Sequence, residues 1–243
     1  MKTQNTSLRN RCSTPWSAGL AGRLAGVWAG AWASVATAAN DGSVPLRLPE
    51  LQRAVLEQPA AAAAALEKAV ADSPDSPEWL YNHGVAAYAA GKFDDALVSL
   101  DRVEGLGNRE LSRRAKFQKG NTEYRAGLAA KQANLDETIY RWRQSLDNYR
   151  GVLKESPGDT RTSENFKLVQ QQLLGLLLEQ ARKNEAEANK AVDDPLRRLE
   201  SRRNAHEKYT EATQIDPENV EAKTGEQSSR RELAQELAKQ GWQ

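Results

Sequence analysis

The chain has 243 residues, and its 34 basic and 33 acidic side chains give a formal net charge of +1. This balance gives no indication of nucleic-acid binding, and a mean hydropathy of −0.73 argues against a polytopic membrane protein. The composition is rich in Ala, Leu, Glu, Gln, Lys and Arg, which favour helices over strands. The sequence therefore predicts an all-α protein.

The N-terminal segment has the pattern of an export signal. Residues 1–40 contain no carboxylate and four basic residues, Lys2, Arg9, Arg11 and Arg23. An uncharged run over 24–38 follows and ends in Ala36-Thr37-Ala38, which suits a signal peptidase. We therefore expect residues 1–39 to be a signal peptide or a membrane-targeting segment. The rest would then be periplasmic, or held at the inner membrane if the segment is not cleaved; a disordered Ala/Gly-rich tail is the alternative.

The remainder of the chain is predicted to be a series of helices. Apolar periodicity indicates helices over 49–57, 59–72, 77–90, 93–104, 111–130, 137–155, 161–190, 195–214 and 219–240. Pro74, Pro157 and Pro217 each follow a helix that they cannot continue. The last helix is polar and suits the end of a repeat array.

Two segments of this region repeat each other at an offset of 36 residues. The matched pairs are Gly84 with Gly120, Tyr88 with Tyr124, and Gly91 with Gly127. Glycine inside a helix costs about 0.5–1 kcal/mol relative to alanine, so Gly84 and Gly120 predict close approach of a neighbouring helix. Gly91 and Gly127 are expected where a first helix ends and the chain turns.

The spacing resembles the tetratricopeptide repeat (TPR). On that register Gly84, Gly91, Phe93, Ala96, Leu100 and Val103 fall on the motif, and the segment Gln-Ile-Asp-Pro-Glu-Asn at 214–219 is similar to its usual ending. The resemblance implies an α-solenoid of antiparallel helix hairpins over residues 46–243. His83 and Lys119 replace the usual leucine, and the thirteen residues 128–140 are an insertion that could lengthen either flanking helix.

The resemblance also implies a binding surface. In TPR proteins the first helices of successive repeats line a concave groove, and the register places eight residues there: Tyr81, Asn82, Val85, Tyr88, Phe117, Asn121, Tyr124 and Arg125. Packing between repeats is the alternative role for these side chains. The carboxylate clamp known in the family is not expected, because Tyr81 stands where it needs lysine and Val85 where it needs asparagine.

No catalytic or cofactor motif is found. The two histidines, His83 and His206, belong to no metal-binding pattern, and there is no phosphate loop or dinucleotide fingerprint. We therefore expect no enzymatic activity, no cofactor and no metal site.

The leading hypothesis is an exported TPR scaffold or adaptor for protein–protein interactions in cell-envelope assembly or stress tolerance. Its arrangement is similar to TPR proteins of aerotolerance clusters, and Asn165-Phe166-Lys167-Leu168 resembles a motif of that group. This resemblance implies a von Willebrand A-type membrane protein, or an envelope assembly factor, as partner. The alternatives are a regulatory module of an envelope enzyme complex, in peptidoglycan or cytochrome maturation, and a small-ligand or enzymatic function on the solenoid itself.

Overall fold

The computed structural model describes residues 48–241, and every regular element in this range is an α-helix. The helices are α2 (Leu48–Glu57), α3 (Pro59–Asp72), α4 (Pro77–Ala89), α5 (Phe93–Gly105), α6 (Arg109–Ala130), α7 (Leu135–Glu155), α8 (Thr160–Lys190), α9 (Pro195–Ile215) and α10 (Val220–Lys239). Their bounds agree with the ranges expected from the sequence to within two residues. The predicted signal segment, 1–39, lies outside the described residues. Within 48–241, no helix has the length and apolar character needed to cross a membrane.

Local side chains explain where most helices begin. Six helices are preceded by an N-cap residue whose side chain accepts a hydrogen bond from the backbone N–H three residues further on: Ser76, Asn108, Asn134, Asp159, Asp194 and Asn219. Each of these bonds satisfies one of the free donors in the first turn of a helix. The helix starts are therefore encoded locally.

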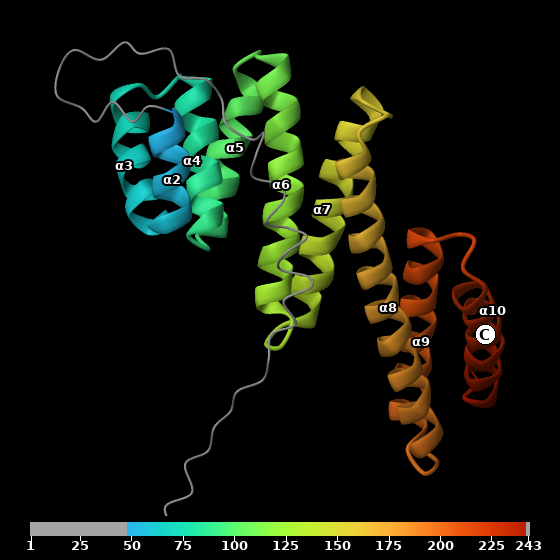
Figure 1. The fold of residues 1–243 in the computed structure, drawn as a ribbon. Helices are drawn as coiled ribbons and strands as arrows, with labels where there is room; N and C mark the ends of the chain where they lie inside the picture. The colour runs from blue at the N-terminus through green and yellow to red at the C-terminus, as the bar shows by residue number, and fades with distance from the viewer. Residues whose placement is uncertain (1–47, 242–243) are drawn as a thin grey trace, which may run out of the picture.

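Successive helices pack against each other as antiparallel hairpins and form an extended array (Figure 1). Contacts also link alternate helices. Asn165 of α8 donates to Asn121 of α6 over 3.0 Å, and Arg143 of α7 pairs with Glu211 of α9 at 2.8 Å. The helices thus lie in two rows, as in a TPR solenoid. At the end of the array, α10 buries Ala222, Ser229 and Glu236, and leaves polar side chains exposed.

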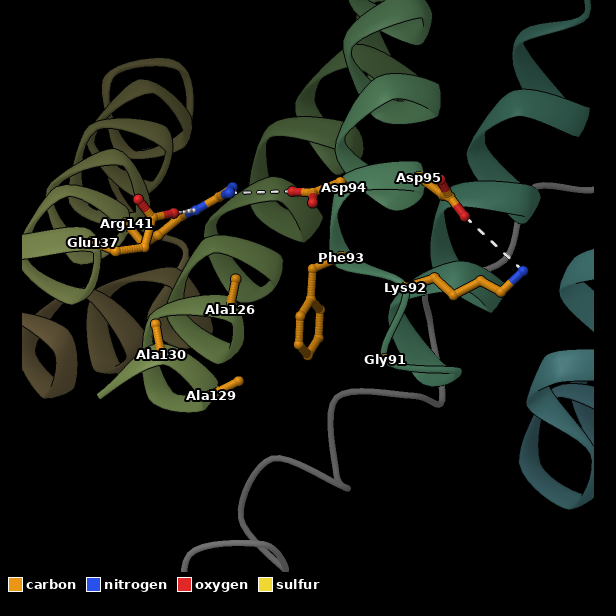
Figure 2. A pocket seen from close by; sticks show the side chains of 10 residues that line it. All are labelled: Gly91, Lys92, Phe93, Asp94, Asp95, Ala126, Ala129, Ala130, Glu137 and Arg141. Atoms are coloured by element: carbon orange, nitrogen blue, oxygen red, sulfur yellow. Dashed lines mark hydrogen bonds and ion pairs between the residues drawn. The ribbon is translucent and has the colours of Figure 1, made fainter. Parts of the chain in front are cut away.

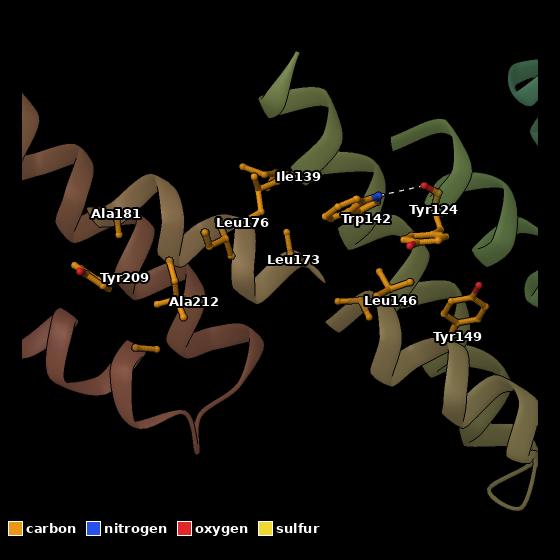
Figure 3. Close-up of a cluster of buried hydrophobic side chains, with 14 residues drawn as sticks. Tyr124, Ile139, Trp142, Leu146, Tyr149, Leu173, Leu176, Ala181, Tyr209 and Ala212 are labelled. Carbon is orange, nitrogen blue, oxygen red and sulfur yellow. Dashed lines mark hydrogen bonds between the residues drawn. The ribbon is translucent and has the colours of Figure 1, made fainter. Parts of the chain in front are cut away.

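The buried core has two main parts that share α6. One cluster joins α2 to α5 and the start of α6, with Tyr81, Leu100 and Leu111 among its members. The other runs from Tyr124 on α6 through α7, α8 and α9 to Ala222 on α10; Figure 3 shows its aromatic end. Because each helix between α2 and α10 contacts the helices before and after it, the array is continuous over the described residues.

Glycines mark two of the close helix contacts, as the sequence predicts. A Cβ built on Gly84 would lie 2.6 Å from Cγ of Leu100, and one on Gly120 would lie 2.5 Å from Cε1 of Tyr149. Gly91 has a φ of 76°, which confirms the expected turn between α4 and α5.

The prediction for Gly127 is wrong. Gly127 lies inside α6, which continues to Ala130, and the backbone turns only after that residue. Its missing side chain makes room for Trp142 of α7. The inserted residues extend the end of α6 and the start of α7, and these helices have 22 and 21 residues while α4 and α5 have 13 each.

Candidate partner-binding cleft

The longer α6–α7 hairpin creates an open cleft beside the α4–α5 turn. At the repeat offset of 36, the last residue before that turn, Ala90, corresponds to Ala126, and α6 continues beyond it. The cleft has a volume of about 500 Å³. Figure 2 shows its lining: Gly91, Lys92, Phe93, Asp94 and Asp95 from the turn and α5, Ala126, Ala129 and Ala130 from α6, and Glu137 and Arg141 from α7. The insertion, residues 128–140, therefore supplies Ala129, Ala130 and Glu137, and the rest of the α6–α7 side comes from the residues directly next to it.

An aromatic cluster forms the apolar side of the cleft. The half-buried ring of Phe93 lies between the turn at Gly91 and the α6 alanines (Figure 2). It packs at a tilt on Tyr88, with ring centroids 6.5 Å apart. The guanidinium of Arg125 lies 4.9 Å from the centroid of Tyr88 and 5.5 Å from that of Phe93. These cation–π contacts hold the Phe93 ring at the edge of the cleft.

One arginine organises the charges on the other side. Arg141 pairs through Nε with Glu137 at 2.6 Å, through Nη1 with Glu123 at 3.3 Å, and through Nη2 with Asp94 at 3.1 Å. Burial raises the pKa of Glu123, although Arg141 acts in the opposite direction. Burial alone would lower the pKa of Arg141, but its carboxylate partners raise it above the ordinary value. Three carboxylates thus share one guanidinium and leave a local excess of negative charge.

The eight residues predicted to line a groove differ in how far they are buried. Six of them are buried: Tyr81, Asn82, Val85, Tyr88, Asn121 and Tyr124. Phe117 and Arg125 are half-buried. The structure brings Tyr88 and Arg125 together beside the cleft, and it places Phe117 against Tyr149, with ring centroids 5.9 Å apart. Partner binding by the set stays a prediction.

Asn121 shows what the buried members do. Its Oδ1 accepts hydrogen bonds from Tyr149 Oη at 2.7 Å and from Asn165 Nδ2 at 3.0 Å, and its Nδ2 donates to Gln118. The amide therefore joins α6, α7 and α8. Its polar atoms hold the repeats together.

Several cleft residues were not anticipated as a site. Asp94 and Asp95 are at the start of α5. Carboxylates are common there because they interact favourably with the helix dipole, so their presence does not by itself indicate a binding site. Glu137 and Arg141 are near the start of α7, where Glu137 lies within the insertion and Arg141 follows it directly. The length of the insertion was the available signal, because extra helical turns must project past the neighbouring repeat.

The histidines make local contacts. Nδ1 of His83 shares a 2.7 Å hydrogen bond with Ser99 Oγ, and Nδ1 of His206 shares one of 3.1 Å with Ser229 Oγ. In the described range 48–241, no group of three or more His, Cys, Asp or Glu side chains is placed to hold a metal ion.

Comparison with known proteins supports the repeat. The family model of the tetratricopeptide repeat matches residues 56–109, from the end of α2 to the start of α6. No curated protein and no solved structure matches the chain significantly. The all-helical arrangement of residues 48–241 is consistent with a TPR solenoid that extends beyond the matched segment. Since TPR domains generally bind protein partners, the match indicates a scaffold for protein–protein interactions.

Proposed function

We propose that the chain is an exported, non-enzymatic scaffold that holds a protein partner in cell-envelope assembly or stress tolerance. The observation that carries the proposal is the open cleft beside a matched tetratricopeptide repeat. The cleft offers an aromatic ring, small alanines and charged groups, a combination that suits a protein segment. Export is supported by the basic and then uncharged pattern of residues 1–39.

A capture experiment tests the scaffold. Tagged residues 46–243 are incubated with envelope extract, and bound proteins are quantified by mass spectrometry. The comparison is with F93A/R125A, which removes the ring and the cation beside the cleft. The matched control is E200Q/E207Q, which changes two exposed positions on α9. We expect the wild type and the control to retain the same partner and F93A/R125A to lose it.

The identity of that partner tests the proposed role in envelope assembly or stress tolerance. Recovery of a von Willebrand A-type membrane protein or an envelope assembly factor supports a role in stress tolerance or envelope assembly. A folded wild type that retains nothing more than F93A/R125A does contradicts partner binding through this cleft.

Export needs its own measurement. The full chain is expressed with a C-terminal tag in a double-membrane bacterium, the cells are fractionated, and the N-terminus of the recovered protein is sequenced. A periplasmic protein that begins just after Ala38 supports cleavage, and a full-length inner-membrane protein supports an uncleaved anchor. Full-length protein in the cytoplasm contradicts export.

A further inference from the structure

The charges of the cleft differ in how far they face solvent. The side chains of Asp94 and Asp95 are 84% and 60% exposed, and that of Glu137 is 39% exposed. The positive side chains are Lys92, at 49%, and Arg141, at 21%. The surface offered to a partner is therefore predominantly acidic, although the cleft contains both signs of charge.

The hydrogen bonds of Arg141 make the cleft still more acidic toward a partner. Each of its three side-chain nitrogens already donates to a carboxylate, so the positive charge of the guanidinium is compensated within the protein and attracts a further anion only weakly. Each carboxylate oxygen can accept more than one hydrogen bond, which leaves Asp94 and Glu137 able to bind a second cation. The other basic residue, Lys92, approaches Asp95 only to 4.0 Å.

The N-terminus of α5 does not make the cleft attractive to anions. A helix N-terminus carries a partial positive charge that attracts anions. Here Asp94 and Asp95 occupy the first turn of the helix and compensate it. An acidic ligand would meet these two carboxylates before it reached the backbone N–H groups.

The apolar part of the cleft adjoins the carboxylates. Phe93 directly precedes Asp94 in the chain, and the small side chains of Ala126, Ala129 and Ala130 lie across from it (Figure 2). A volume of about 500 Å³ lies within the range usual for ligand sites and can hold large side chains of a partner. Alanine side chains also let a partner backbone approach α6 closely.

We propose that this cleft binds a basic and apolar segment of a partner protein. An aromatic or aliphatic side chain of the segment packs on Phe93 and the α6 alanines, and a neighbouring lysine or arginine pairs with Asp94 and Glu137. The inference rests on the proposed scaffold function and specifies the chemistry of its partner.

The test is selection from a random library of short peptides displayed on phage, with the folded 46–243 chain as target. Peptides recovered on wild type are synthesised with a fluorescent label, and their affinities are measured by polarisation. We expect enrichment of lysine or arginine close to aromatic or aliphatic residues. D94N/D95N removes the two most exposed carboxylates of the cleft, and we expect it to weaken binding about tenfold. Raising NaCl from about 0.05 to about 0.5 M should also weaken binding, because salt screens exposed charges.

Control variants separate the cleft from general effects of charge. E200Q/E207Q removes the same number of negative charges from α9 and should leave peptide affinity unchanged. F93A should weaken binding without altering its salt dependence, because it removes only the apolar contact. All variants are compared by circular dichroism before use.

The outcomes distinguish this inference from the scaffold function. Enrichment of acidic peptides, or of peptides that bind D94N/D95N as tightly as wild type, overturns the inference and leaves a binding scaffold in place. Failure to recover any peptide also overturns the inference, since a cleft that binds a short protein segment must select peptides from a random library. The capture experiment with envelope extract then decides the scaffold function separately.

Discussion

Gly127 of α6 lies directly against the indole ring of Trp142 on α7. A Cβ built on Gly127 would be 2.5 Å from Cδ1 and 2.6 Å from Nε1 of that ring. The indole is fully buried, and its Nε1 donates to the carbonyl of Tyr124 over 3.1 Å (Figure 3). The contact fixes the pairing of the two long helices that overhang the cleft.

We expect G127A to destabilise the protein by about 1–3 kcal/mol, although alanine is the better helix former, because a methyl group there overpacks a rigid site. Urea unfolding of the two proteins measures the difference. The matched control is G175A in α8, where a Cβ would meet nothing within 4 Å. G175A should be neutral or stabilise by up to about 1 kcal/mol. Equal stability of G127A and G175A would contradict the packing described here.

The buried tyrosines of the predicted groove should act mainly on stability. Tyr124 is 5% exposed and its ring lies 5.8 Å from that of Trp142. We expect Y124A to destabilise by about 3–5 kcal/mol, as for other large-to-small core substitutions. R125A, at a half-buried position, should cost about 1 kcal/mol through the lost cation–π contacts. Thermal melts of both variants make the comparison, and a Y124A protein as stable as R125A would place Tyr124 on the surface.

His83 should make stability depend on mildly acidic pH. Burial lowers its pKa below the ordinary 6.5, although Glu67 and Asp95 act in the opposite direction. A histidine with a lowered folded-state pKa contributes stability that is fully present above pH 6.5 and is lost as the pH falls toward the folded-state value. Melting temperatures of wild type and H83L between about pH 7.5 and 5.5 test this. We expect the melting temperature of wild type to fall further than that of H83L, and parallel curves would contradict the assignment.

An ion pair should stabilise the last helix. Glu236 of α10 is 2% exposed, and its Oε1 accepts from Nε and Nη2 of Arg198 on α9, at 2.9 and 2.7 Å. Hydrogen bonding to Arg198 lowers the pKa of Glu236 below the ordinary 4.5. The stabilisation is therefore present above pH 4.5 and is lost as the pH falls through the lower folded-state value.

We expect E236Q to lower the melting temperature at neutral pH, and the difference from wild type to shrink in acid below pH 4.5. The control is E226Q in the same helix, where the side chain of Glu226 is 19% exposed and that of its partner Arg230 is 68% exposed. Because an ion pair four residues apart within one helix contributes only about 0.3–0.5 kcal/mol, E226Q should melt close to wild type. A pH-independent difference for E236Q would show that the charge of Glu236 has no role.

Much of the local structure could be predicted because its causes are local. The cap residues Ser76, Asn108 and Asp159 satisfy donors of the turns that follow them, and prolines stop the helices before them. Gly84 and Gly120 predict close contacts from the sequence because glycine inside a helix is costly unless a neighbouring helix needs the space. Position 91 requires a positive φ, which glycine adopts without strain.

The sequence by itself thus determined the helices, their order and the repeat of 36 residues. Only the tertiary structure decided that Gly127 packs on Trp142 inside a helix, because an insertion can extend either helix or the turn, and packing selects among them. It also decided which predicted groove residues are buried, since burial depends on the neighbouring repeats. The grouping of Phe93 with Arg141 in one cleft has the same origin: these residues meet only because the lengthened hairpin overhangs the preceding repeat.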